Sequence, residues 1–127
     1  MINDPIVPRD NINPKDWKKF LKDFSDRNNG RRSRFDIFKS GGEILEENLE
    51  AHFEEARLEE IGDKKNVVIT RIDRTDANAE KLKNEVTNVR GIAVQFETDG
   101  SDNVLEITDD QNSLISLRFE SKVDGVS

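Results

Sequence analysis

Four lysines near the start of the chain recur at the spacing of one helix face: Lys15, Lys18, Lys19 and Lys22. Side chains three and four residues apart are neighbours on a helix, so these ammonium groups would form one positively charged stripe. Such a stripe could bind an anionic ligand, and these four lysines are the candidate binding residues. The alternative interpretation, which we favour, is that the stripe is the solvated side of an amphipathic helix.

The only histidine, His52, lies in an acidic run with Glu50 on one side and Glu54 and Glu55 on the other. A carboxylate could orient its imidazole as a general base, which would place the site of a small carboxylate-dependent enzyme near Glu50–Glu55. The sequence has no cysteine to act as a nucleophile and no serine in a recognisable nucleophile elbow. We therefore predict no catalytic residue, and the enzyme stands as the alternative to a binding function.

Two acidic turns, Asp99–Asn103 and Asp109–Asn112, carry the oxygen atoms that Ca²⁺ prefers. Neither turn has the spacing of an EF-hand loop or its closing glutamate, and the same residue types commonly form tight turns. Zinc sites need three or four ligands, which one histidine without cysteine does not supply. We predict no metal site and no other cofactor.

An amphipathic helix over Asn13–Gly30 must position the lysines. Asn13 is suited to cap its first turn, and Pro14 fits the first helical position, where no N–H is needed. Ile12 and Trp17 can pack together across the cap as a hydrophobic staple, and glycine often ends a helix. The face opposite the lysines is apolar and consists of Trp17, Phe20, Leu21 and Phe24.

After the helix the apolar period changes from 3.6 to 2, which predicts strands. Phe35 and Ile37 alternate with polar residues in a strand at about 32–39, and the run Val67–Ile72 predicts another. The last third of the chain has three alternating segments separated by polar turns, which predicts a three-stranded antiparallel meander. These segments are Ile92–Phe96, Val104–Thr108 and Ile115–Phe119.

Two segments fit either a helix or a strand. In residues 44–61 the glutamates favour a helix, whereas Leu49, Ala51 and Phe53 alternate as in a strand. In residues 77–86, Asp76 could cap a short helix, whereas the alternation through Val86 fits a strand. Both choices stay open on these residues alone.

Length and composition indicate one domain with a compact core and a very polar exterior. The chain has 127 residues, 33% of them hydrophobic and 37% charged, and we place the domain at residues 12–120 with mobile tails at 1–11 and 121–127. No cysteine is available for disulfides. No apolar run approaches the roughly 20 residues of a membrane span, and the N-terminus lacks the apolar part of a signal peptide. We therefore expect a cytoplasmic protein with no membrane partner.

The net charge of −7 is unevenly distributed. Residues 1–40 contain 10 Lys and Arg against 6 Asp and Glu, a balance of +4, whereas residues 41–127 contain 10 against 21, a balance of −11. The acidic part would repel phosphate, which argues against nucleic acid as a partner. The two zones could instead pair within the chain or between two copies, so we expect a homodimer or a protein partner.

The segment Asn13–Arg27 resembles the opening of a family of small bacterial proteins of unknown function, whose chains begin with a Pro-x-x-Trp helix followed by an antiparallel sheet. The likeness covers roughly residues 12–120. At Arg57 and Glu60 the chain departs from the proline and glycine that family members often carry. The resemblance implies strands rather than a helix in residues 49–61, and it implies no activity, cofactor or active-site residue. Its later parts are Arg57–Ile61, Asp63–Ile69, Leu105–Asp110 and Leu114–Phe119.

These patterns together predict an α+β fold, with an N-terminal amphipathic helix packed on a mostly antiparallel, meander-like sheet of about five to seven strands. The function they favour is a non-enzymatic binding or assembly module, one form of which is self-association. The predicted core consists of Trp17, Phe20, Leu21, Phe24, Phe35, Ile37, Ile69, Ile92, Val94, Phe96, Leu105, Ile107, Ile115, Leu117 and Phe119.

Overall fold

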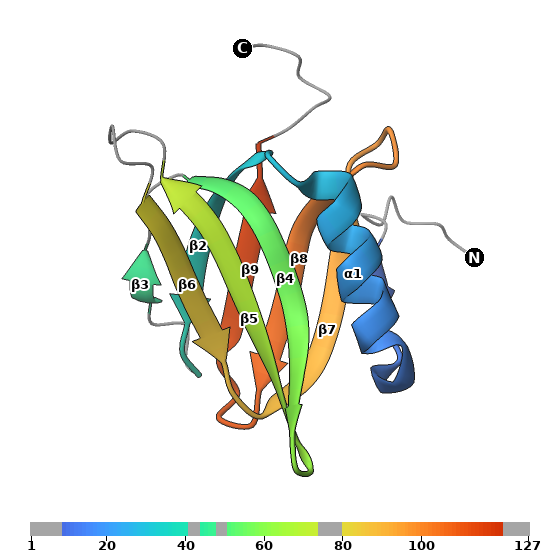
Figure 1. Cartoon of the computed structure of the whole chain (residues 1–127), viewed down its shortest axis with the longest axis vertical. Helices are drawn as coiled ribbons and strands as arrows, with labels where there is room; N and C mark the ends of the chain where they lie inside the picture. Colours follow the sequence, from blue (N-terminus) through green and yellow to red (C-terminus); the bar gives the residue numbers. More distant parts are fainter. Residues whose placement is uncertain (1–8, 41–43, 48–50, 74–79, 121–127) are drawn as a thin grey trace, which may run out of the picture.

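A computed structural model of the chain describes residues 9–40, 44–47, 51–73 and 80–120. Within these ranges the fold is one antiparallel sheet with a single α-helix beside it (Figure 1). The elements are β1 (Arg9–Asn11), η1 (Pro14–Asp16), α1 (Trp17–Asn28), β2 (Arg32–Phe38), β3 (Ile44–Glu47), β4 (Ala51–Ile61), β5 (Lys64–Asp73), β6 (Glu80–Val86), β7 (Val89–Phe96), β8 (Asp102–Asp109) and β9 (Leu114–Phe119).

The strands follow the order β1-β7-β8-β9-β2-β4-β5-β6, and β3 pairs with β2 outside this path. Every pairing is antiparallel. Strand β2 joins the two halves of the sheet. It pairs with β9 along its length and, among the described residues, it pairs with β4 through Arg32–His52 and Ser33–Ala51. The helix α1 packs beside β4 (Figure 1).

The predicted meander is confirmed in β7, β8 and β9, which are consecutive neighbours. Their registers align apolar positions across three strands, for example Ile92 opposite Ile107 and Ile107 opposite Ile115. All three of these side chains are buried. Alternation therefore located these strands correctly, because one face of each strand meets the core.

The number of strands is larger than predicted. In the described ranges the path contains eight strands and β3 adds a ninth, against an expected five to seven. The excess comes partly from the segments that the sequence left ambiguous, because the described parts of 44–61 form β3 and β4 and residues 80–86 form β6. Residues 9–11, which the sequence pattern assigns to a tail, form β1 and pair with β7. The possible helix cap at Asp76 and the rest of both tails lie outside the described residues.

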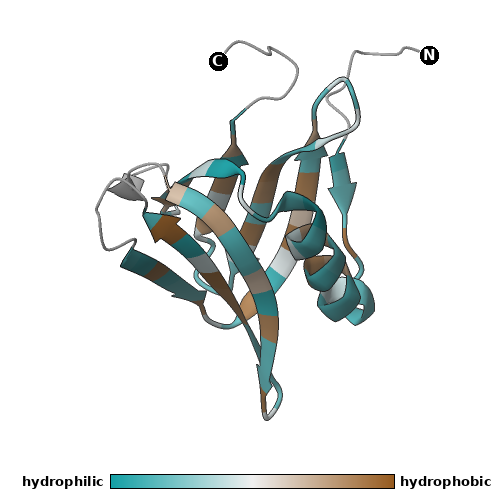
Figure 2. Ribbon diagram, turned by 45° about the horizontal axis from the view of Figure 1, so that its top comes forward, coloured by the Kyte–Doolittle hydropathy of each residue, from teal (hydrophilic) through white to brown (hydrophobic). Residues whose placement is uncertain are grey.

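Pairing with neighbouring strands outweighs the helix propensity of the glutamates in β4. Phe53 and Ala56 of this strand are buried, while Glu54 and Glu55 are half-buried. Figure 2 shows hydrophobic and hydrophilic residues alternating along the strand. Intrinsic helix propensity differs by only a few tenths of a kcal/mol per residue between most residue types. Contacts with neighbouring strands therefore determine that this segment forms a strand and not a helix.

The helix begins as predicted, with one 3₁₀ turn before the α-helix. Asn13 accepts a hydrogen bond from the Lys15 N–H at 3.1 Å through its side-chain oxygen. The Trp17 indole N–H donates to the Ile12 carbonyl at 3.0 Å, and Ile12 packs against the core. These contacts hold the first turn in place and bury Trp17.

The core lies where α1 meets the inner faces of the strands. An aromatic cluster at its centre joins Phe24 of α1 to Phe53 of β4 and Phe119 of β9, with ring centroids 5.5–5.6 Å apart. All predicted core residues are buried except Phe20, Ile37 and Phe96, which are half-buried and pack against the core. Phe53 is buried as well but is not among the predicted core residues, because its segment fits both a helix and a strand.

Candidate functional site

A groove of about 960 Å³ runs between α1 and β4. One wall is the side of the helix that carries the lysine stripe, and the other wall is the middle of β4. This groove is the candidate site, because it brings together all four lysines that the sequence singled out. Its lining residues are Lys15, Lys18, Lys19, Lys22, Ser25, Asp26, Asn29, Glu54, Glu55, Ala56, Arg57 and Leu58.

The lysines differ in the partners that they have. Lys19 bonds Asp23 at 2.9 Å and Lys22 bonds Asp26 at 3.2 Å, each one helical turn apart. The bond between Lys19 and Asp23 raises the pKa of the lysine and lowers the pKa of the aspartate. Lys15 and Lys18 are exposed and form no ion pair within the described residues. The positive charge of the groove is therefore concentrated toward the start of the helix.

The acidic side chains on the β4 wall already have cationic partners that do not belong to the stripe. Glu54 pairs with Lys81 of β6 at 3.3 Å. Glu55 pairs with Arg57 of its own strand at 3.4 Å. Arg57 also pairs with Glu59, which does not line the groove, at 2.9 Å, and this bond raises the pKa of the Arg57 guanidinium. The acidic wall and the lysine wall thus face one groove without forming an ion pair with each other among the described residues.

Side chains from the end of α1 occupy part of the β4 edge. The Ser25 hydroxyl accepts from the Ala56 N–H at 2.9 Å and lies 2.9 Å from the Ala56 carbonyl and 2.7 Å from that of Leu21. The Asn29 amide donates to the Glu54 carbonyl at 2.9 Å. The helix therefore supplies hydrogen bonds that a neighbouring strand would otherwise make.

Replacing Ser25 with alanine should lower the free energy of unfolding by about 1–3 kcal/mol, the usual cost of leaving buried polar groups unsatisfied. Ser25 and Ala56 are both buried, so water cannot easily replace the lost bonds. Urea denaturation followed by circular dichroism measures this change. Asn29→Ala is the control, and its effect should be smaller because its bond is exposed. Equal losses in the two variants would contradict this role for Ser25.

The residues of the alternative enzyme site are only partly brought together. Glu54 and Glu55 line the groove, but both carboxylates are ion-paired. His52 is half-buried between Arg32 of β2 and Ile72 of β5 and does not line the groove. Glu50 lies outside the described residues. The described geometry therefore places no histidine beside the groove carboxylates.

The carboxylates of Asp99 and Asp109 accept hydrogen bonds from residues of their own turns. The Asp99 carboxylate accepts from the Ser101 N–H at 2.9 Å and from its hydroxyl at 2.6 Å. Asp109 accepts from the N–H groups of Gln111 and Ser113, each at 2.9 Å. In the described parts of the chain, no three His, Asp or Glu side chains gather where they could bind one metal ion.

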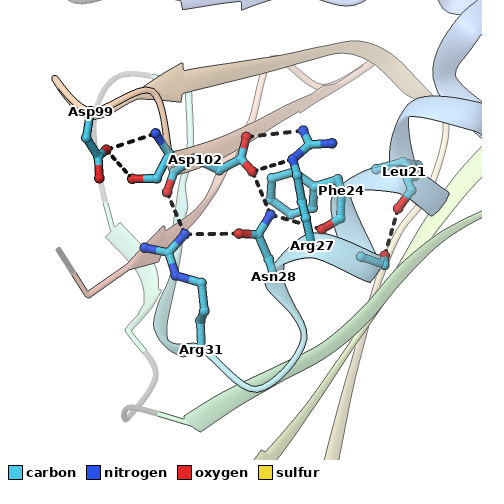
Figure 3. A network of polar contacts seen from close by, with 9 residues as sticks. Leu21, Phe24, Arg27, Asn28, Arg31, Asp99 and Asp102 are labelled. Carbon is cyan, nitrogen blue, oxygen red and sulfur yellow. Dashed lines mark hydrogen bonds and ion pairs between the residues drawn. The ribbon is translucent and has the colours of Figure 1, made fainter. Parts of the chain in front are cut away.

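A buried carboxylate from the first acidic turn, which the sequence weighed as a calcium ligand, instead anchors the end of the helix (Figure 3). Asp102, at the start of β8, accepts two bonds from Arg27 at 2.7 and 3.2 Å and one from the Asn28 amide at 2.8 Å. Arg31 donates to the Asp102 carbonyl at 2.7 Å and lies 4.5 Å from the centre of the Phe119 ring. Burial lowers the pKa of the Arg31 guanidinium. This network holds the C-terminal end of α1, and so sets where the helix wall of the groove stands.

Comparison of the chain with family models, curated proteins and solved structures found no match. No helix in the described ranges is long and apolar enough to cross a membrane. The function is therefore inferred from the groove and from the charges that line it.

Proposed function

We propose that this chain is a non-enzymatic binding module and that the α1–β4 groove binds an acidic segment of a protein partner. One observation carries the proposal: Lys15 and Lys18 line the groove and have no ion-pair partner among the described residues. The acidic residues of the opposite wall do not neutralise them, because Lys81 and Arg57 hold those carboxylates. A carboxylate of a ligand could form ion pairs with Lys15 and Lys18.

Charge also favours a polypeptide over nucleic acid. A nucleic-acid strand carries a phosphate at every nucleotide and would meet Glu54 and Glu55 as well as the lysines. A protein segment need not carry a charge at every residue, so its carboxylates can lie beside the lysines and its neutral residues beside Glu54 and Glu55. Two copies of this chain could associate in the same way, since residues 41–127 are strongly acidic.

The test is a double variant, Lys15→Gln with Lys18→Gln, whose binding to fluorescent polyglutamate is measured by anisotropy at low salt. We expect about a five- to tenfold loss of affinity, because each exposed charge pair contributes up to about 1 kcal/mol. Lys39→Gln with Lys83→Gln is the matched control, since both lysines are exposed and do not line the groove. The control removes the same charge and should bind as the wild type does.

An equal loss in both double variants would show that net charge alone drives binding and would refute the site. Tight binding of random-sequence duplex DNA at physiological salt would refute the choice of a protein partner. Light scattering of the wild type and the groove variant at low and high salt tests self-association. Salt and the substitutions should both weaken a dimer held by the lysines.

The carboxylate-dependent enzyme has less support. An acid–base mechanism needs a titratable side chain within reach of the substrate, and the groove carboxylates are already paired with cations. The one histidine does not line the groove. No observation on the described residues favours this second function over binding.

A further inference from the structure

Beyond Ala56, β4 has an open edge on the side of the groove. The strand pairs with β5 as far as Ile61, but with β2 only through Ala51 and His52. Backbone groups of an antiparallel strand alternate in direction along its length. The Ala56 N–H and C=O face the helix, where they bond Ser25, so those of Leu58 and Glu60 face the same side.

No described residue bonds the backbone of Leu58 or Glu60 from that side. Leu58 also lines the groove together with Lys15 and Lys18. The open edge and the two unpaired lysines therefore belong to one surface. Free strand edges readily accept another strand, and the groove provides the space beside this one.

The lysines stand level with the open part of the edge. Asn29, just after the helix, bonds Glu54, and Ser25 within the helix bonds Ala56, so the helix and β4 run in opposite directions (Figure 1). From Ser25 back to Lys18 the helix covers about 10 Å at 1.5 Å per residue. From Ala56 forward, about 10 Å corresponds to three strand residues. Lys18 therefore lies beside the Leu58–Glu60 stretch, and Lys15 lies slightly beyond it.

We propose that the ligand is an extended acidic peptide that adds to β4 as a strand. This inference rests on the proposed function and specifies the form of its partner. The peptide backbone bonds the N–H and C=O groups of Leu58 and Glu60, and its carboxylates reach Lys15 and Lys18. Strand addition of this kind draws affinity from main-chain bonds and specificity from alternate side chains. A helical acidic ligand would satisfy the lysines but leave the edge open.

A ten-residue peptide of alternating glutamate and valine, with both ends blocked, is the probe. Two analogues of it carry N-methyl groups, one on every glutamate and the other on every valine. All three peptides have the same carboxylates and the same length. In a strand, alternate N–H groups point to opposite edges, so only one set can bond β4. We expect one analogue to lose at least tenfold in affinity and the other to bind nearly as the parent does.

Two variants of the protein test the same main-chain bonds between the peptide and β4. Glu60→Pro removes an N–H that faces the groove, at an exposed position near the end of the strand, where proline is tolerated. Glu60→Ala loses the same charge and keeps the N–H. We expect the proline variant to bind the parent peptide at least fivefold more weakly than the alanine variant, with both folded by circular dichroism. In ¹⁵N spectra, the amides of Leu58 and Glu60 should shift on titration.

The outcomes separate the two proposals. If both methylated analogues bind as the parent does while the Lys15 and Lys18 double variant still weakens binding, strand addition is refuted and the acidic-ligand groove stands. If the double variant binds the parent as well as the wild type does, the proposed function fails. The peptide analogues leave the protein unchanged, so the test of strand addition does not depend on whether Glu60→Pro folds.

Discussion

Replacing Trp17 with alanine is expected to lower the free energy of unfolding by about 3–5 kcal/mol, the range found when a buried aromatic side chain is truncated. Trp17 is 3% exposed and belongs to the core cluster. The substitution also removes the indole N–H bond to Ile12 that holds the first turn against the sheet. Stability of a domain of this size is typically 5–15 kcal/mol, so much of it should be lost.

Urea denaturation followed by far-ultraviolet circular dichroism measures this effect, because the chain has one tryptophan and the variant loses its fluorescence. Trp17→Phe is the control, since it keeps an aromatic ring in the core but lacks the N–H donor. The free energy of unfolding of Trp17→Phe should lie between those of the wild type and the alanine variant. An unchanged denaturation midpoint in Trp17→Ala would place this residue outside the core.

Replacing Asp102 with alanine is expected to cost about 2–4 kcal/mol, since it removes a buried carboxylate that accepts charge-assisted bonds. The Asn28 amide would lose a buried acceptor, while Arg27, which is about half exposed, could turn to solvent. The loss should therefore be smaller than for a fully enclosed ion pair. Because this network holds the end of α1, the variant should also bind polyglutamate more weakly.

Thermal and urea denaturation measure the stability change, and Asp110→Ala is the matched control because Asp110 is exposed and also lies in a polar turn. That control should stay within about 0.5 kcal/mol of the wild type. If Asp102→Ala were as stable as the control, the carboxylate would have no structural role and the position of the helix would need another cause.

Local patterns predicted the helix and the last three strands. The cap at Asn13 and the apolar face through Phe24 depend on residues within a few positions of each other, and so does the alternation in Ile115–Phe119. Each of these signals is a periodicity that one element carries alone. Such patterns are readable without knowing what packs against them.

The rest of the fold depends on partners that are distant in the sequence. Segment 44–61 has glutamates that suit a helix and apolar positions that suit either form. Its residues 51–61 form β4, and the pairing of this strand with β5 decides between the two. In the sequence, Asp102 has the pattern of a turn residue. Its structural role cannot be read there, because its partners Arg27 and Asn28 lie more than 70 positions away. The sequence located the lysine stripe but not the groove, which exists only because α1 packs beside β4.

The central place of β2 has a consequence for how the chain folds. Its partners on the two sides come from distant parts of the sequence: Ser33 pairs with Ala51 of β4 on one side and with Phe119 of β9 on the other. During synthesis, β2 can meet β4 early but must wait for nearly the whole chain before it acquires β9. Pairings this distant in sequence are slow to form because a long loop must close first. Until then β2, β4 and β5 form an incomplete sheet, and β9 joins this part to the meander.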